Sequence, residues 1–352
     1  MKHIRQIAVL CGAAALGVVA MPGTSAACSW FGSSGWSCSG SASNYNAQPG
    51  APVAGAVQRS GTTTQVSAIA NHLGGAFSAS GARRVASLGE TGIAGGDASS
   101  RYSLWVNGSG GRVSSTSPAN DFSGNNKGGA VGMDYAPSDN LLVGVALMGE
   151  HISLNTKFNL GSLNRVGYSV VPYVAYSFGQ GTSIDVITSA TFLDADVVRA
   201  QNGRGSYDGY RLMGAFNVHH GVELGAWSVR GDIGYMYSRE WQGSYREEVS
   251  NAHIGAVASN LGQGKIGGRG GYLLDKVELF AQAHYVRDFV AKRTSTVQGQ
   301  PNTPDDRDEV LAGIGMDWFP TQTESIGLEI SHGFFREAEA NTTMMMNAKI
   351  KF

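Results

Sequence analysis

The sequence predicts an all-β protein, with about twelve antiparallel strands over residues 101–352 closed into a transmembrane β-barrel behind a short helix. Three observations carry this prediction. Apolar and polar residues alternate with a period of two, tight turns alternate with long polar connections, and the chain begins like a secreted protein. Only 15% of the 352 residues are charged, yet the mean hydropathy is -0.11. Since only alternate side chains of a barrel strand meet lipid, near-neutral hydropathy is compatible with a membrane barrel.

Residues 1–27 are predicted to be a cleaved signal peptide. Lys2 and Arg5 make the N-terminal region positively charged. Residues 7–20 then form an uncharged apolar run, and small residues follow it. The run is short for a membrane span and no basic stop signal follows it, which disfavours a retained anchor. No later apolar run reaches 18 residues, so no other helix is expected to span a membrane.

The mature chain is expected to hold two cysteines, Cys28 and Cys38, which could form a disulfide in an oxidising compartment. A lipidated Cys28 is the alternative, but Ser25 stands where a lipidation site normally has an aliphatic residue. No CxxC motif or neighbouring histidine pair accompanies the cysteines, so we expect no metal and no cofactor. A net charge of -1 also argues against a nucleic-acid partner.

The region before the barrel divides into two parts. Residues 28–60 are rich in small and polar residues and predict an extended or disordered leader, or a minimal passenger. Residues 61–100 predict a linker that contains a helix near 62–88, because Val66, Ile69, Leu73 and Phe77 recur on one helical face. The helix is expected to plug the lumen, with an ordinary periplasmic element as the alternative.

The C-terminal segment shows the strand pattern most clearly. Met344, Met346 and Ile350 alternate with polar residues that include Lys349 and Lys351, so one face is apolar and the other polar. The same alternation predicts strands at 102–113, 128–136, 141–151, 166–178, 182–198, 208–219, 229–237, 253–270, 277–285, 308–319, 326–330 and 344–352. Strands this long disfavour a soluble β-sandwich, which is the alternative fold.

Tight turns are predicted at 137–140, 179–181 and around Gly221, whereas longer polar loops are predicted at 114–126, 152–165, 240–252 and 293–307. Aromatic residues near the strand ends predict two girdles at the membrane interfaces. Polar residues with inward parity are expected to keep the lumen wet. These candidates are Arg230, Asp232, Glu278, Glu329, Lys349 and Lys351.

Residues 101–352 resemble the autotransporter β-domain, the translocator of type V secretion. The resemblance rests on the segment from Tyr173 to Gly179, the strand around Tyr285 to Phe289, and the closing run from Ala348 to Phe352. It implies a monomeric barrel in the lipid of a Gram-negative outer membrane, assembled with periplasmic chaperones and the barrel-assembly machinery. Ile350 and Phe352 resemble the signal that this machinery reads.

The short leader departs from the family pattern, which usually includes a passenger of hundreds of residues. We therefore expect a barrel that translocates or displays its own short N-terminal segment. Two alternatives stay open: a passenger-less surface or adhesive barrel, and a small diffusion pore. No enzymatic activity is expected, because His219, Asp288 and Ser331 show no recognisable catalytic spacing.

Some autotransporters cut their own chain inside the lumen, using an asparagine of the linker helix and acidic residues of the wall. This resemblance makes Asn71 a candidate, with Glu329, Asp232 and Glu278 as the acidic groups. His284 also has inward parity, whereas His332 is predicted to face outward near an interface.

Overall fold

The computed structural model describes residues 28–30, 36–38, 50–74, 101–117, 120–179, 181–199, 203–249, 251–295, 306–321, 323–336 and 338–352. The predicted signal peptide, the leader apart from its two short strands and its last residues, and the linker after residue 74 lie outside these ranges. Within them, no helix is long and apolar enough to cross a membrane. The chain forms two compact units, residues 1–42 and 43–352.

The first unit contains a small antiparallel hairpin formed by β1 (Cys28–Trp30) and β2 (Trp36–Cys38). Its register places Cys28 directly opposite Cys38. Directly opposed residues of an antiparallel pair have Cα atoms about 4.5–5.5 Å apart, which falls within the range that a disulfide spans. This backbone register is compatible with the predicted disulfide, which stays a prediction.

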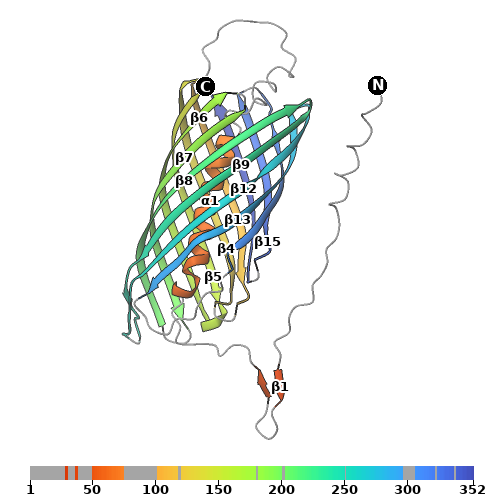
Figure 1. The fold of residues 1–352 in the computed structure, drawn as a ribbon. Helices are drawn as coiled ribbons and strands as arrows, with labels where there is room; N and C mark the ends of the chain where they lie inside the picture. The colour runs from red at the N-terminus through yellow and green to blue at the C-terminus, as the bar shows by residue number, and fades with distance from the viewer. Residues whose placement is uncertain are drawn as a thin grey trace. The chain divides into compact units, whose positions relative to one another are not determined.

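The second unit is a closed barrel of twelve antiparallel strands (Figure 1). Strand β16 pairs with β3, so the last strand closes the barrel against the first. The strands are β3 (Tyr102–Ser115), β4 (Phe122–Ser138), β5 (Leu141–Thr156), β6 (Gly161–Gly179), β7 (Thr182–Arg199), β8 (Gly203–Leu224), β9 (Trp227–Gln242), β12 (Val257–Leu274), β13 (Val277–Ser295), β14 (Asp308–Trp318), β15 (Glu324–Phe334) and β16 (Glu339–Lys351). The predicted fold class and strand number are confirmed.

Burial alternates along the strands, as the period-two pattern predicted. In β7, residues 185–197 alternate strictly between buried and exposed side chains. Strand lengths run from 11 residues in β14 to 22 in β8, far above the usual five or six of soluble sheets. Several predicted strands are longer than expected and extend into the segments predicted as loops.

The connections differ at the two ends of the barrel. The end with short turns, here called the turn end, has turns at 139–140, 225–226 and 275–276 and short connections between β6 and β7 and between β14 and β15, and it carries the C-terminus. The opposite loop end carries the longer connections, and the connection of residues 243–256 contains the hairpin of β10 (Tyr245–Arg246) and β11 (His253–Ile254). The turn predicted at Gly221 is wrong. Gly221 is extended within β8, and the turn falls at Gly225, whose φ of 68° favours glycine.

Aromatic side chains gather on the outer surface near both ends of the strands. At the turn end, Tyr102 stacks on Tyr135, and Trp227 lies edge-on to Tyr272. Toward the loop end, Tyr210 stacks on Trp241. Two such belts are typical of a barrel that meets a membrane interface at each end.

The one α-helix of the described residues, α1 (Gly50–Gly74), lies inside the barrel (Figure 1). It begins twelve residues before the predicted start near residue 62, so the predicted boundary of the leader at residue 60 is wrong. The physical reason is its composition. Gly55, Gly61 and three consecutive threonines from Thr62 are poor helix formers, so packing in the lumen rather than intrinsic propensity sustains this part of the helix. Phe77 lies outside the described residues.

Candidate functional site: the helix-filled lumen

Near the loop end, the first half of α1 packs in an apolar layer. Val53, Ala56 and Val57 pack with buried residues of six strands, β3 to β8, and of the short 3-10 turn Lys157–Asn159. Those residues are Val113, Phe122, Ile152, Leu154, Phe158, Leu163, Ala195, Val197 and Tyr207. This layer places the N-terminal end of α1 at the loop end of the barrel.

A buried ion-pair network lies next to this layer, on the side toward the turn end. It consists of Glu150 (β5), Arg165 (β6), Arg211 (β8) and Glu240 (β9), here called the charge quartet. Arg165 bridges Glu150 and Glu240 at 3.2 and 2.8 Å, and Arg211 bridges the same two carboxylates at 2.5 and 3.4 Å. All four side chains are buried. Two cations and two anions therefore neutralise one another in the wall.

The backbone of α1 passes directly over the charge quartet at Gly61. A Cβ atom at this position would lie 2.6 Å from Arg211 Nη1 and 2.8 Å from Glu150 Oε2. Arg165 Nη2 also donates a hydrogen bond to the carbonyl oxygen of Val57 at 3.3 Å. Only glycine permits this approach, so Gly61 sets how closely the helix lies against the wall.

Glutamine side chains extend the polar contact along the helix. Gln65 Nε2 donates to Ser169 Oγ at 2.8 Å, and Ser189 Oγ donates to Gln65 Oε1 at 3.1 Å. Gln58 Nε2 donates to Ser238 Oγ of β9 at 2.9 Å. These bonds satisfy buried amides that would otherwise be costly in a lumen filled by a helix.

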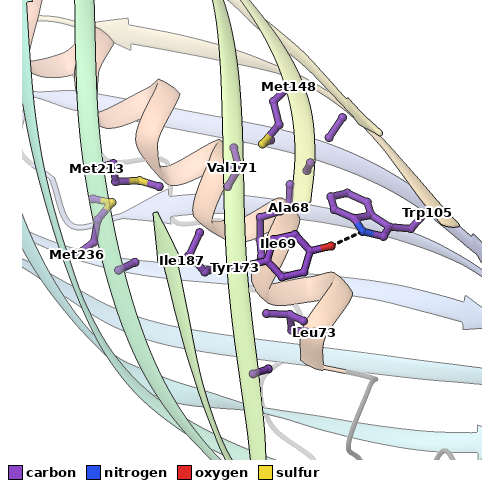
Figure 2. Packing of buried hydrophobic residues seen from close by; sticks show 14 of the residues in the cluster. Ala68, Ile69, Leu73, Trp105, Met148, Val171, Tyr173, Ile187, Met213 and Met236 are labelled. Carbon is purple, nitrogen blue, oxygen red and sulfur yellow. Dashed lines mark hydrogen bonds between the residues drawn. The ribbon is translucent and has the colours of Figure 1, made fainter. Parts of the chain in front are cut away.

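Toward the turn end, a second apolar layer holds the last turns of α1 (Figure 2). Ala68, Ile69 and Leu73 pack against Tyr173, Val171 and other wall residues. Trp105 Nε1 donates to Tyr173 Oη at 2.7 Å, as the dashed line in Figure 2 shows. This layer places the C-terminal end of α1 at the turn end of the barrel.

A polar cluster closes the same end. His72 Nε2 lies 2.7 Å from Asp134 Oδ2, and the His72 ring stacks on Trp105. Asp134 also accepts hydrogen bonds from Ser103 and Tyr173. The helix is thus held at its C-terminal end by one carboxylate of β4.

The other face of α1 borders a cavity of about 120 Å³. The helix contributes residues at three- and four-residue spacing, including Arg59, Thr63, Val66 and Ala70. The wall contributes polar residues of β9 and of β12 to β16. One side of the helix is therefore packed and the other lies beside a polar space.

The lumen-facing candidates lie at different depths. Arg230, Asp232 and Glu329 line the cavity, and Asp232 is held by His284 at 2.8 Å and by Lys265 at 3.0 Å. Glu278 is buried and bonded to Arg269 at 3.1 Å. Lys349 Nζ lies 3.9 Å from Asp134, whereas Lys351 is exposed at the end of β16.

The sequence prediction missed the charge quartet. Arg165 and Glu240 lie in segments predicted as loops, where the alternation of a strand does not apply. A usable signal was present for Glu150, which shares the inward parity of Ala146 and Met148.

The structure also places the remaining candidates. Asn71 Nδ2 donates to Glu329 Oε2 at 3.1 Å, so the helix asparagine lies beside one of its three proposed acidic groups. His332 is on the outward face of β15, bonded to Thr342. Phe352 N donates to the carbonyl oxygen of Tyr102 at 3.0 Å, and Ile350 is exposed on the outer face.

Comparison with protein families gives a match to the autotransporter β-domain over residues 104–331. The chain belongs to this family. Membership indicates an outer-membrane barrel of a Gram-negative bacterium. Comparison with curated proteins finds no match for the chain.

Solved autotransporter domains share the fold at low sequence identity. The translocator domain of NalP from Neisseria meningitidis has a TM-score of 0.61 at 14% identity, covering 77% of this chain and 94% of its own. The β-domain of the Bordetella autotransporter BrkA has a TM-score of 0.60 at 15% identity, covering 72% and 100%. The transport unit of AIDA-I from Escherichia coli has a TM-score of 0.55 at 13% identity, covering 77% and 97%.

Proposed function

We propose that this barrel translocates its own N-terminal segment across the outer membrane and is then plugged by α1. The direction of the helix carries the proposal. Its N-terminal end packs at Phe158 and Phe122 of the loop end, and its C-terminal end is bonded to Asp134 at the turn end. Strand β3 also begins at the turn end.

This direction has a topological consequence. Long connections of an outer-membrane barrel lie outside the cell and short turns lie in the periplasm. In that orientation α1 runs inward from the outer side of the barrel, although strand β3, which follows it in the chain, begins at the periplasmic side. A segment with this path has crossed the membrane through the lumen. Periplasmic chaperones, the barrel-assembly machinery and a monomeric state belong to the same proposal, as does the absence of an enzymatic activity on other molecules.

Export can be tested with an epitope inserted at residue 40 in the full chain. The tag is expected to be labelled by antibody on intact cells, as is a control tag in the connection of residues 243–256. A tag in the turn at 139–140 is expected to be labelled only after the outer membrane is permeabilised. A residue 40 tag that stays protected while the barrel shows a normal heat-dependent gel shift contradicts translocation.

The cavity beside α1 favours a second candidate, a small diffusion pore. In that case the barrel would conduct with the helix in place, because solute would pass through the cavity of about 120 Å³. A translocator whose plug closes the lumen is expected to conduct only when the helix is displaced. Conductance of the intact chain in planar bilayers separates these two functions.

We also propose that Asn71 can cleave the chain at the Asn71–His72 bond. In this reaction the side-chain amide nitrogen attacks the main-chain carbonyl carbon of Asn71, a succinimide forms, and the bond to the His72 nitrogen breaks. In this proposal Glu329, whose Oε2 accepts a hydrogen bond from Asn71 Nδ2 at 3.1 Å, takes up the amide proton that attack releases, and the departing amine of His72 is protonated. Gln282 Nε2 holds the other oxygen of Glu329 at 2.6 Å.

Cleavage is expected to yield a barrel fragment beginning at His72 in purified outer membranes, detected by N-terminal sequencing. The Asn71→Ala variant is expected to lose this fragment and the Gln282→Glu variant to reduce it. An Asn71→Asp variant controls for helix packing. Recovery of the intact chain alone from the unaltered protein would remove this proposal and would leave translocation unaffected.

A further inference from the structure

We propose that the outer surface of β3, β4 and β5 binds a phosphorylated glycolipid of the outer leaflet. Phosphate would bind a basic patch formed by Arg112, Lys127 and His151, and acyl chains would lie over glycines immediately below it. This inference rests on the membrane orientation given above, and not on translocation.

The basic patch is continuous across the three strands. Lys127 pairs directly with His151, and Arg112 pairs with Asn125, two residues from Lys127 on the same outward face. All three basic side chains are exposed. Directly opposed side chains on one face lie about 5 Å apart and diagonal ones about 7–8 Å apart, so one phosphorylated headgroup can reach more than one of them.

Among the residues that the structure describes, no acidic side chain forms an ion pair with the arginine or the lysine of the basic patch. The outward faces of β16, β3, β4, β5 and β6 carry no Asp or Glu, and neither Arg112 nor Lys127 forms an ion pair with the described part of the chain. The other side of the barrel differs, since Asp194, Asp196 and Asp208 accompany Arg204 there. An uncompensated cationic surface next to a membrane attracts anionic lipid headgroups.

The height of the basic patch fits a headgroup. Lys127 lies eight residues from Tyr135, the turn-end girdle residue of the same strand. At about 3.3 Å per residue and a tilt near 40°, this is roughly 20 Å along the membrane normal. The apolar band of an outer-membrane barrel is about 25 Å tall, so the patch lies at its outer edge.

Glycines immediately below the basic patch leave a depression in the lipid-facing surface. Gly108, Gly129 and Gly149 are directly opposite one another in a row across the three strands. A Cβ atom at Gly108 or Gly149 would have no heavy atom within 4 Å. Met346 pairs with Gly108 on one side and Tyr168 with Gly149 on the other, so larger side chains flank the row. An acyl chain can occupy this space while its phosphate meets the cations above.

The test uses the full-length protein in detergent micelles and native mass spectrometry with diphosphoryl lipid A as the probe. The Arg112→Gln/Lys127→Gln double variant is expected to bind the probe at least about tenfold more weakly, since each cation near a lipid surface contributes a factor of about five. Arg204→Gln removes an equally exposed outward arginine beside acidic groups and is the matched control, expected to bind like the parent protein.

Two further measurements identify which parts of the lipid are bound. Lipid A without phosphates is expected to bind as weakly to the parent as diphosphoryl lipid A does to the double variant. Gly149→Leu, whose side chain projects into open space, is expected to weaken lipid binding by occupying the acyl position. Equal lipid binding by the parent and the double variant overturns the proposal, as does equal competition by inorganic phosphate. The heat-dependent gel shift and the residue 40 tag report barrel assembly and translocation separately.

Discussion

Replacing Gly61 by valine is expected to open the plugged barrel, whereas the same replacement at Gly55 leaves it closed. At Gly61 the new Cβ would meet Arg211 and Glu150, which are fixed by their ion pairs. At Gly55 a Cβ atom meets nothing within 4 Å. Both changes raise helix propensity slightly, so propensity does not separate them. Overpacking of this kind costs about 1–3 kcal/mol, which is enough to shift the helix away from the wall.

Single-channel recording in planar bilayers measures this difference. The parent protein and Gly55→Val are expected to show rare, small openings, and Gly61→Val is expected to show frequent openings several-fold larger. Equal conductance of the two variants would mean that Gly61 does not set the position of α1. Loss of the heat-dependent gel shift in Gly61→Val alone would instead indicate that the barrel had failed to assemble.

The strands were predictable because lipid acts on every second residue. Beyond the membrane, polar side chains face outward and apolar side chains face the helix. The sequence prediction of the strand ends failed in these parts of the strands. In β5, Ile152 and Leu154 face the helix while Ser153 and Asn155 face outward, so an apolar inner face was mistaken for the start of a polar loop. Strand ends beyond the membrane can be predicted only when the element that fills the lumen is known.

The helix and the charge quartet were harder to predict for a common reason. Each lies against the other, at Gly61 and at the Val57 carbonyl oxygen. Gly61 weakens an isolated helix, and Arg211 has no favourable place in a wall without Glu150 and Glu240. The sequence predicted one of the two polar contacts near the end of α1. Asn71 and Glu329 were both candidates and are hydrogen-bonded, whereas the bond from His72 to Asp134 was not predicted.

Replacing Arg211 by methionine is expected to destabilise the folded barrel by about 3–5 kcal/mol, the usual result of removing one partner from a buried ion-pair network. Glu150 and Glu240 would then share Arg165 alone under the helix. Urea unfolding in lipid vesicles, followed by the gel mobility shift, measures this change. Arg204→Gln, an exposed outward arginine, is expected to change the free energy of unfolding by less than about 0.5 kcal/mol.

The two substitutions Gly61→Val and Arg211→Met are also expected to be coupled. The charge quartet is buried because α1 covers it, so displacing the helix would let water of the lumen reach Glu150 and Glu240. Arg211→Met should then lower the free energy of unfolding by less in the Gly61→Val background than in the parent. The interaction energy from the double-mutant cycle should reach about 1–3 kcal/mol. Additive effects would show that the quartet stabilises the wall without help from the helix. A coupling of the expected size would show that Gly61 and Arg211 form one contact and that this contact fixes the position of α1 in the lumen.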